Sequence, residues 1–197
     1  MTEHLLSLWT QPRATIQRII DDNPEQHVAL LVLIMGMAAA MPNLAAPEGG
    51  LAGFALALLL APIIMVISLY LTGWLYRIVG GWLGGKGEGR QLRAAIAWAY
   101  VPQILLNIIW LLLFLVAPQA MSAGAESLVA EPQAMTWLWY GIALVLGLWG
   151  LVIHLKMVGQ VHGFSAWRAL GTALLSVVLV ALVIGVPVGL IAALAVA

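Results

Sequence analysis

The sequence predicts an all-α integral membrane protein, a bundle of five transmembrane helices preceded by an amphipathic N-terminal helix. Hydrophobic residues make up 63% of the chain and charged residues only 8%, whereas a soluble domain carries about 25% charged residues. The mean hydropathy is +1.05. Because so few charges cannot cover a water-facing surface, the chain belongs in a bilayer. The positions of the basic residues then indicate how many times it crosses.

Charge and cysteine content exclude several classes of function. The formal net charge is zero, which argues against nucleic-acid binding, where a basic face is expected. Cysteine is absent, so disulfides, thiol catalysis and thiolate metal sites are excluded. The sequence has no long polar segment that would indicate a separate soluble domain. We expect a cytoplasmic or interfacial segment over residues 1–26 and one membrane domain over residues 27–197.

The N-terminal segment has the pattern of an amphipathic helix. Its apolar side chains recur at helical spacing on one face: Leu5, Trp9, Pro12, Ile16, Ile19 and Ile20. We expect Thr10 to cap a helix whose first turn contains Pro12, and Arg18 to pair with Asp22 one turn later. The apolar face either lies in the membrane interface or packs on the spans, and the sequence leaves both open.

Five apolar runs supply the predicted spans, at about residues 28–44, 51–79, 94–116, 136–155 and 169–196. A crossing needs about 17–25 residues, so the second run is one tilted crossing rather than two. Pro62, Pro102 and Pro187 lie within spans and predict breaks or kinks. Gly53, Ala57 and Ala61 form a stripe of small residues that predicts close helix packing.

The basic residues predict the orientation. All eight lysines and arginines lie in the N-terminal segment, the second loop or the fourth loop. Five crossings place all of these segments on one side of the membrane, and a miscount by one span would destroy the segregation. Since lysine and arginine favour the cytoplasmic side, we expect the N-terminus inside and the C-terminus outside.

The glycine-rich second loop has the frame of a phosphate-binding loop, Gly80-x-x-x-x-Gly85-Lys86. In that motif, backbone N–H groups and the lysine hold a nucleotide phosphate, and a serine or threonine follows to bind magnesium. Here the following residue is Gly87, and a membrane helix replaces the strand that should precede the motif. The sequence therefore favours a flexible cytoplasmic turn over a nucleotide site.

Histidines offer no metal or catalytic arrangement at the sequence level. His27, His154 and His162 include no pair spaced four apart, and no carboxylate lies within a predicted span to join them. No nucleophile–base pattern is recognisable either. We therefore expect no metal, no cofactor and no enzymatic activity.

The second loop carries the first candidate site, a basic and aromatic cluster of Trp82, Lys86, Arg90 and Arg93. Such a cluster can bind anionic lipid head groups, at about 1 kcal/mol for each basic residue near the membrane surface, or a protein partner. The same residues also serve as topology markers, and the two roles are compatible.

The second candidate site lies within the spans. Gln103 and Asn107 are one helical turn apart, and His154 lies near the cytoplasmic end of the fourth span. Together they can line a path for a small molecule. The alternative is that Gln103 and Asn107 form hydrogen bonds between helices, or satisfy the backbone carbonyl that Pro102 leaves unpaired.

Several motifs resemble the Yip family, five-span membrane proteins named for interaction with Ypt/Rab GTPases, and in particular its short bacterial members. The motifs are Leu8-Trp-Thr-Gln-Pro-Arg13, Gly84-Gly-Lys-Gly87 with Arg90-Gln-Leu92, Ala99-Tyr-Val-Pro102, and His162-Gly-Phe-Ser165 with Arg168-Ala-Leu170. The resemblance implies a cytoplasmic N-terminus, an external C-terminus and a bacterial inner membrane. It supplies no catalytic residues.

From the resemblance and the residues together, we expect a non-enzymatic adaptor or organiser in membrane homeostasis or in lipid and protein organisation. Membrane lipids are the expected partners, together with other membrane proteins or further copies of the chain. The chain lacks the long N-terminal region of eukaryotic relatives, so GTPase binding is not expected. The alternatives are a small-molecule transporter or channel lined by Gln103, Asn107 and His154, and an accessory subunit of a larger membrane complex.

Overall fold

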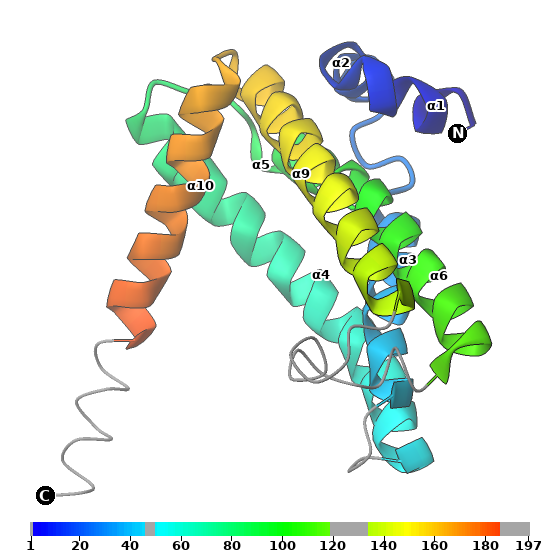
Figure 1. Ribbon diagram of the computed structural model, residues 1–197. Coiled ribbons are helices and arrows are strands. Elements are labelled where there is room, and N and C mark those ends of the chain that lie inside the picture. Colours follow the sequence, from blue (N-terminus) through cyan, green and yellow to red (C-terminus); the bar gives the residue numbers. More distant parts are fainter. Residues whose placement is uncertain (1, 46–49, 119–133, 186–197) are drawn as a thin grey trace, which may run out of the picture.

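The computed structural model describes residues 2–45, 50–118 and 134–185, which are helical apart from short connections (Figure 1). No β-strand occurs in these three ranges. The elements follow in the order α1 (Thr2–Thr10), α2 (Pro12–Asp22), α3 (Val28–Ala40), the 3₁₀ helix η1 (Met41–Ala45), α4 (Gly50–Trp82), α5 (Gly89–Trp98), α6 (Val101–Val116), α9 (Ala134–His162), α10 (Ala166–Val180) and the π-helical turn η2 (Ala181–Gly185).

Five helical segments are long and apolar enough to cross a membrane, which confirms the predicted all-α fold and the number of apolar helices. They are Val28–Ala45, Gly50–Trp82, Gly89–Val116, Thr136–His162 and Ala166–Val183. Their outer faces carry exposed apolar side chains such as Leu59, Ile67 and Leu144. These side chains suit hydrocarbon and would be unfavourable in water. Pro187 and the end of the predicted fifth span lie outside the described residues.

The helices α3 and α4 approach each other closely at one glycine. A Cβ at Gly36 would collide with the Pro62 Cα and lie 2.7 Å from the Pro62 nitrogen. Backbone atoms cannot move aside as a flexible side chain can, so the approach requires glycine. The helix α4 continues through Pro62. Gly53 makes no such approach to any described residue, since none lies within 4 Å of a Cβ built there, so this part of the predicted stripe does not pack on the described helices.

Pro102 divides the third crossing into two helices. The helix α5 ends at Trp98 and α6 begins at Val101, with Pro102 in its first turn. A proline there loses no hydrogen bond, because the first N–H groups of a helix lack helical partners. The helix α5 begins at Gly89, earlier than predicted, because Glu88 and Gln91 form a capping box. The break predicted at Pro102 is confirmed by the end of α5 and the start of α6.

The N-terminal helices pack on the bundle. The helix α2 lies against α5 and α9, and Ile16 and Ile19 are fully buried in the common core. The apolar face thus contacts protein. The predicted cap is wrong: Thr10 ends α1, and Gln11 precedes α2 without a side-chain capping bond.

The predicted pairing of Arg18 with Asp22 is not the arrangement observed. Arg18 Nε donates instead to the Ala14 carbonyl at 3.3 Å. On the same helix, Gln17 Nε2 donates to Asp21 at 2.8 Å. Both contacts are exposed and lie within α2, so neither of them docks the helix onto the described part of the bundle.

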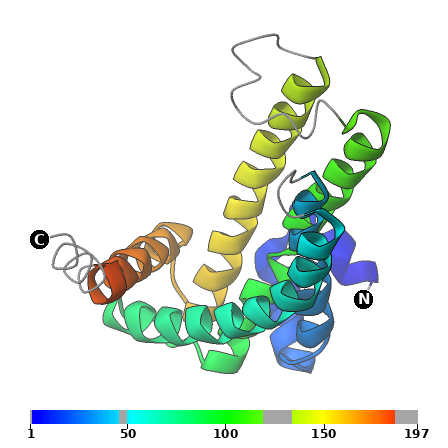
Figure 2. The same cartoon turned by 90° about the horizontal axis from the view of Figure 1, so that it is seen from below.

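The segments that carry all eight lysines and arginines lie at one end of the bundle. Figure 1 shows α2, the α4–α5 connection and the α9–α10 connection at this end. In both views α10 packs on α4 and α9, on the side away from α3 and α6 (Figure 2). We call this end of the bundle the basic end. The side of the membrane that it faces stays a prediction.

Candidate functional site

The glycine-rich loop after α4 encloses the side chain of His162, the last residue of α9. A Cβ at Gly85 would lie 2.7 Å from the His162 Cγ, and one at Gly87 would lie 3.0 Å from Nδ1. A Cβ at Gly80 would collide with the same ring. These three glycines therefore leave room for an imidazole ring, which accounts for the frame that resembles a phosphate-binding loop.

Hydrogen bonds fix this loop, so it is not the predicted flexible turn. The Gly87 N–H donates to His162 Nδ1 at 3.2 Å, and the Lys86 N–H donates to the His162 carbonyl at 3.2 Å. The imidazole also stacks on Phe164, with centroids 4.9 Å apart and planes 11° from parallel. Because Nδ1 accepts this hydrogen bond, the neutral ring carries its proton on Nε2.

The ring of His162 is almost completely buried, at 2% exposure. The backbone of Tyr76 interacts with it from α4, but Nε2 has no partner with full hydrogen-bond geometry among the described residues. The ring is thus held by packing and by one amide. This arrangement leaves no space for a substrate beside Nδ1.

Arg13 joins the N-terminal helix to the same region. Its Nη1 donates to Gln160 Oε1 at 3.2 Å and its Nη2 to the Phe164 carbonyl at 3.2 Å. Gln160 Nε2 in turn donates to Gln17 Oε1 at 3.0 Å. Three motifs that are far apart in the sequence therefore meet at the basic end. They end at Arg13, Gly87 and Ser165. Their spacing along the chain gives no sign of this contact.

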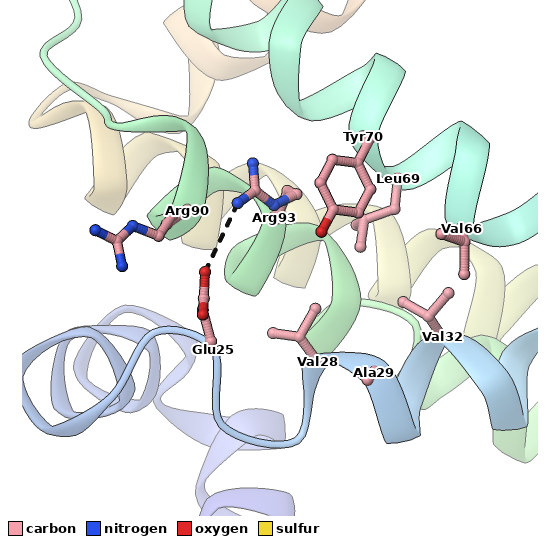
Figure 3. A pocket seen from close by; sticks show the side chains of 9 residues that line it. All are labelled: Glu25, Val28, Ala29, Val32, Val66, Leu69, Tyr70, Arg90 and Arg93. Carbon is pink, nitrogen blue, oxygen red and sulfur yellow. Dashed lines mark ion pairs between the residues drawn. The ribbon is translucent and has the colours of Figure 1, made fainter.

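A pocket of about 310 Å³ lies beside this region, between α3, α4 and α5 (Figure 3). We call it the arginine pocket; its lining residues are Glu25, Val28, Ala29, Val32, Val66, Leu69, Tyr70, Arg90 and Arg93. Arg93 Nη2 lies 3.9 Å from Glu25 Oε1, and its Cζ lies 4.5 Å from the centre of the Tyr70 ring, a cation–π geometry. The pocket therefore combines a cationic rim with an apolar wall.

A second hollow of about 290 Å³ shares Arg90 and Arg93 with the arginine pocket and adds Arg77, Glu88 and Gly89. Three guanidinium-bearing residues thus border two adjoining hollows at the start of α5. The sequence predicts Arg77 only as a topology marker, because the approach of Arg77 to α5 depends on the turn between the two helices.

The predicted basic and aromatic cluster is therefore divided by the fold. Arg90 and Arg93 border both hollows. Trp82 and Lys86 are exposed and line neither of them. Glu25 and Tyr70 also border the arginine pocket and are not predicted from the sequence, because they come from segments far from α5 in the chain.

The predicted intramembrane site is also divided. Gln103 and His154 line one cavity of about 280 Å³, together with Tyr100. Asn107 is absent from that lining, and its Nδ2 donates to the Gln103 carbonyl at 2.9 Å within α6. That bond neither joins two helices nor reaches the carbonyl freed by Pro102. Tyr76, which the sequence analysis missed, places its hydroxyl 3.1 Å from His154 Nε2.

The three histidines considered as metal ligands have separate neighbours. His27 meets the edge of Trp98, with centroids 6.1 Å apart. His154 contacts Tyr76, and His162 lies in the glycine loop. Within residues 2–45, 50–118 and 134–185, no group of three His, Asp or Glu side chains is placed to hold a metal ion.

Comparison with known proteins assigns the family. The model of the Yip1 domain matches residues 6–187, a stretch that runs from α1 past η2 and includes every motif of the resemblance. No curated protein and no solved structure is detectably similar to the chain. Because the family match covers nearly the whole sequence and the fold contains five long apolar helices, the chain belongs to the Yip1 domain family of membrane proteins.

Proposed function

We propose that this protein is a non-enzymatic organiser of the membrane that gathers anionic lipid at its basic end. The observation that carries the proposal is the meeting of Arg77, Arg90 and Arg93 around two adjoining hollows, one of which has an apolar wall. A guanidinium presents a rigid fork of donors that matches phosphate oxygens. Lipid phosphate is the anion that a membrane protein meets at the ends of its crossing helices.

The charges around the hollows favour an anion. Three arginines face two carboxylates, Glu25 and Glu88. Arg77 and Arg90 are exposed, and the ion pair of this region joins Arg93 to Glu25 at the long distance of 3.9 Å. The two exposed guanidiniums are therefore accessible to an incoming phosphate. A cytoplasmic N-terminus in a bacterial inner membrane, which we also propose, would place them at the anionic cytoplasmic leaflet.

The contacts of His162 and Asn107 support a role in membrane organisation rather than in catalysis, because both side chains are engaged within the protein. His162 packs within the glycine loop, and Asn107 is bonded inside its own helix. In this proposal lipids are the primary partners, and other membrane proteins or further copies of the chain bind along the exposed apolar faces.

Lipid analysis of the purified protein tests the proposal. The protein is extracted in a mild detergent from membranes of equal phosphatidylglycerol and phosphatidylcholine content, and the retained lipid is quantified. We expect phosphatidylglycerol to be enriched, and the enrichment to disappear in the variant Arg77→Gln/Arg90→Gln/Arg93→Gln. Arg18→Gln is the matched control, because its side chain lies on α2 away from both hollows. Equal retention of the two lipids by the unaltered protein would refute the proposal.

A second candidate function is passage of a small solute along the Gln103 and His154 cavity. It is favoured by one observation, that both side chains line the same space at the level of the spans. Light scattering of proteoliposomes in a glycerol gradient is the test. Passage through this cavity predicts a flux that falls in Gln103→Leu and persists in Asn107→Leu, since Asn107 does not line it. A flux equal to that of empty liposomes would remove this candidate.

A further inference from the structure

The arginine pocket has two chemically distinct parts. Arg90 and Arg93 border its polar side, and Val32 of α3 and Val66 of α4 belong to its apolar wall (Figure 3). Its volume of about 310 Å³ is at the lower end of the range for ligand pockets, roughly 300–1,000 Å³. A ligand that fits must carry an anion directly beside a hydrocarbon portion.

Arg93 is held in place before any ligand arrives. Its side chain is only 22% exposed, and its guanidinium lies over the Tyr70 ring. Its stem passes α4 at Gly73, where a Cβ would lie 3.0 Å from the Arg93 Cγ. A donor fixed in this way loses little conformational freedom on binding, which favours affinity.

Glu25 is the group that an anion would displace. Its side chain is 60% exposed and its oxygen lies 3.9 Å from Arg93, which is longer than a charge-assisted hydrogen bond of about 2.7–2.9 Å. Exposed pairs of this kind contribute little to stability. A phosphate can therefore replace the Glu25 carboxylate beside Arg93, and Arg90 borders the same pocket.

The apolar wall leads toward the bilayer. Val66 is 45% exposed and lies on α4, a crossing helix whose neighbouring outward side chains, such as Ile63 and Ile67, are also exposed. A hydrocarbon chain that leaves the pocket past Val66 therefore meets the exposed apolar side chains of Ile63 and Ile67.

Resting on the proposed function, and going beyond it, we propose that the arginine pocket binds a single anionic glycerophospholipid. The phosphate bridges Arg90 and Arg93 in place of Glu25, and one acyl chain lies along the exposed side chains of Ala29 and Val66. The site selects for both parts of the lipid at once. A soluble phosphate ester binds more weakly because it lacks the acyl chain. A zwitterionic lipid binds more weakly because it brings a cation close to the guanidiniums.

Native mass spectrometry of the full chain in mild detergent tests this proposal. With phosphatidylglycerol added, we expect a peak for one bound lipid. Arg90→Gln should weaken its binding about tenfold or more, as expected for loss of a charge-assisted hydrogen bond. Ala29→Trp should weaken it similarly by filling the pocket without changing any charge. Glu25→Gln should strengthen binding, because it removes the competing carboxylate.

Controls separate the site from general effects on the fold. Leu59→Trp adds the same aromatic side chain at an exposed position of α4 outside the pocket and should leave binding unchanged. Each variant is compared by thermal unfolding, and Ala29 is exposed, so a folded Ala29→Trp protein is expected. Glycerol phosphate at the same concentration is the soluble control, and it should neither bind to the protein nor compete with phosphatidylglycerol.

The outcomes distinguish the two proposals. Selective phosphatidylglycerol binding that Ala29→Trp leaves intact would overturn the single-lipid pocket while keeping the proposed function. Competition by glycerol phosphate would also overturn the lipid assignment, because it would show a site for phosphate alone. Equal binding of phosphatidylglycerol and phosphatidylcholine would overturn both proposals.

Discussion

The amide of Gly87 donates a hydrogen bond to Nδ1 of His162 across 3.2 Å, and this contact joins the loop after α4 to the end of α9. The two residues are separated by two crossing helices in the sequence. The bond explains two of the family motifs at once, since the glycine loop and the His162-Gly-Phe-Ser165 segment are the two sides of one interface. It also makes the glycine loop a structural element of the bundle.

Gly85→Ala should destabilise the protein, because the added Cβ would lie 2.7 Å from the His162 Cγ and 2.8 Å from the Phe164 Cε1. Both neighbours are rings held by stacking, so they cannot move aside at little cost. Overpacking of this kind costs about 1–3 kcal/mol. Thermal unfolding in detergent measures the effect. Gly81→Ala is the matched control, because nothing lies within 4 Å of its Cβ position, and an equal loss in both variants would contradict the interpretation.

His162→Phe should also destabilise the protein, for a different reason. The phenyl ring keeps the stacking on Phe164 but leaves the buried Gly87 N–H without its acceptor, which costs about 1–3 kcal/mol. His162→Ala removes the ring altogether, and in that background Gly85→Ala should cost less than in the unaltered chain, because only the contact with Phe164 remains. Unfolding of the two single variants and the double variant measures this coupling. Strict additivity would show that Gly85 and His162 do not interact.

Gly36→Ala should separate α3 from α4. The new Cβ would collide with the backbone of Pro62, and the two helices would have to move apart because neither backbone can yield locally. We expect a loss of at least about 1–3 kcal/mol, measured by thermal unfolding. Gly53→Ala on α4, whose Cβ would meet no atom of the described residues within 4 Å, should be neutral or slightly stabilising. A neutral Gly36→Ala variant would count against so close an approach of α3 and α4.

Arg13→Ala should release α2 from the bundle. It removes the hydrogen bonds to Gln160 and to the Phe164 carbonyl, and hydrogen bonds to charged groups contribute about 1.5–3 kcal/mol each. Hydrogen exchange of the α2 amides should therefore accelerate at least about tenfold, while exchange in α9 changes little. Arg18→Ala is the control, since the hydrogen bond that Arg18 forms among the described residues lies within α2. Unchanged exchange in the Arg13 variant would show that apolar burial alone holds the helix.

The membrane class, the all-α fold, the five apolar helices and the family can all be predicted from the amino-acid sequence. Each of these follows from properties that are local or summed along the chain: run length, composition and motif order. The break at Pro102 is predictable for the same reason, since proline acts on its own turn. Small errors arise where capping decides a boundary, as at Gln11 and Glu88, because several polar residues compete for each helix start.

Which residues act together depends on the assembled bundle. Gly85 contacts His162, and Arg77 joins Arg90, because helices that are distant in the sequence pack at one end of the bundle. Gly36 makes a close approach to α4, whereas Gly53 makes none to the part of the chain that the structure describes. Lipid-facing and protein-facing surfaces of a membrane helix are equally apolar, so hydrophobic periodicity carries little information about which face packs. That information arises only when all the helices are packed together.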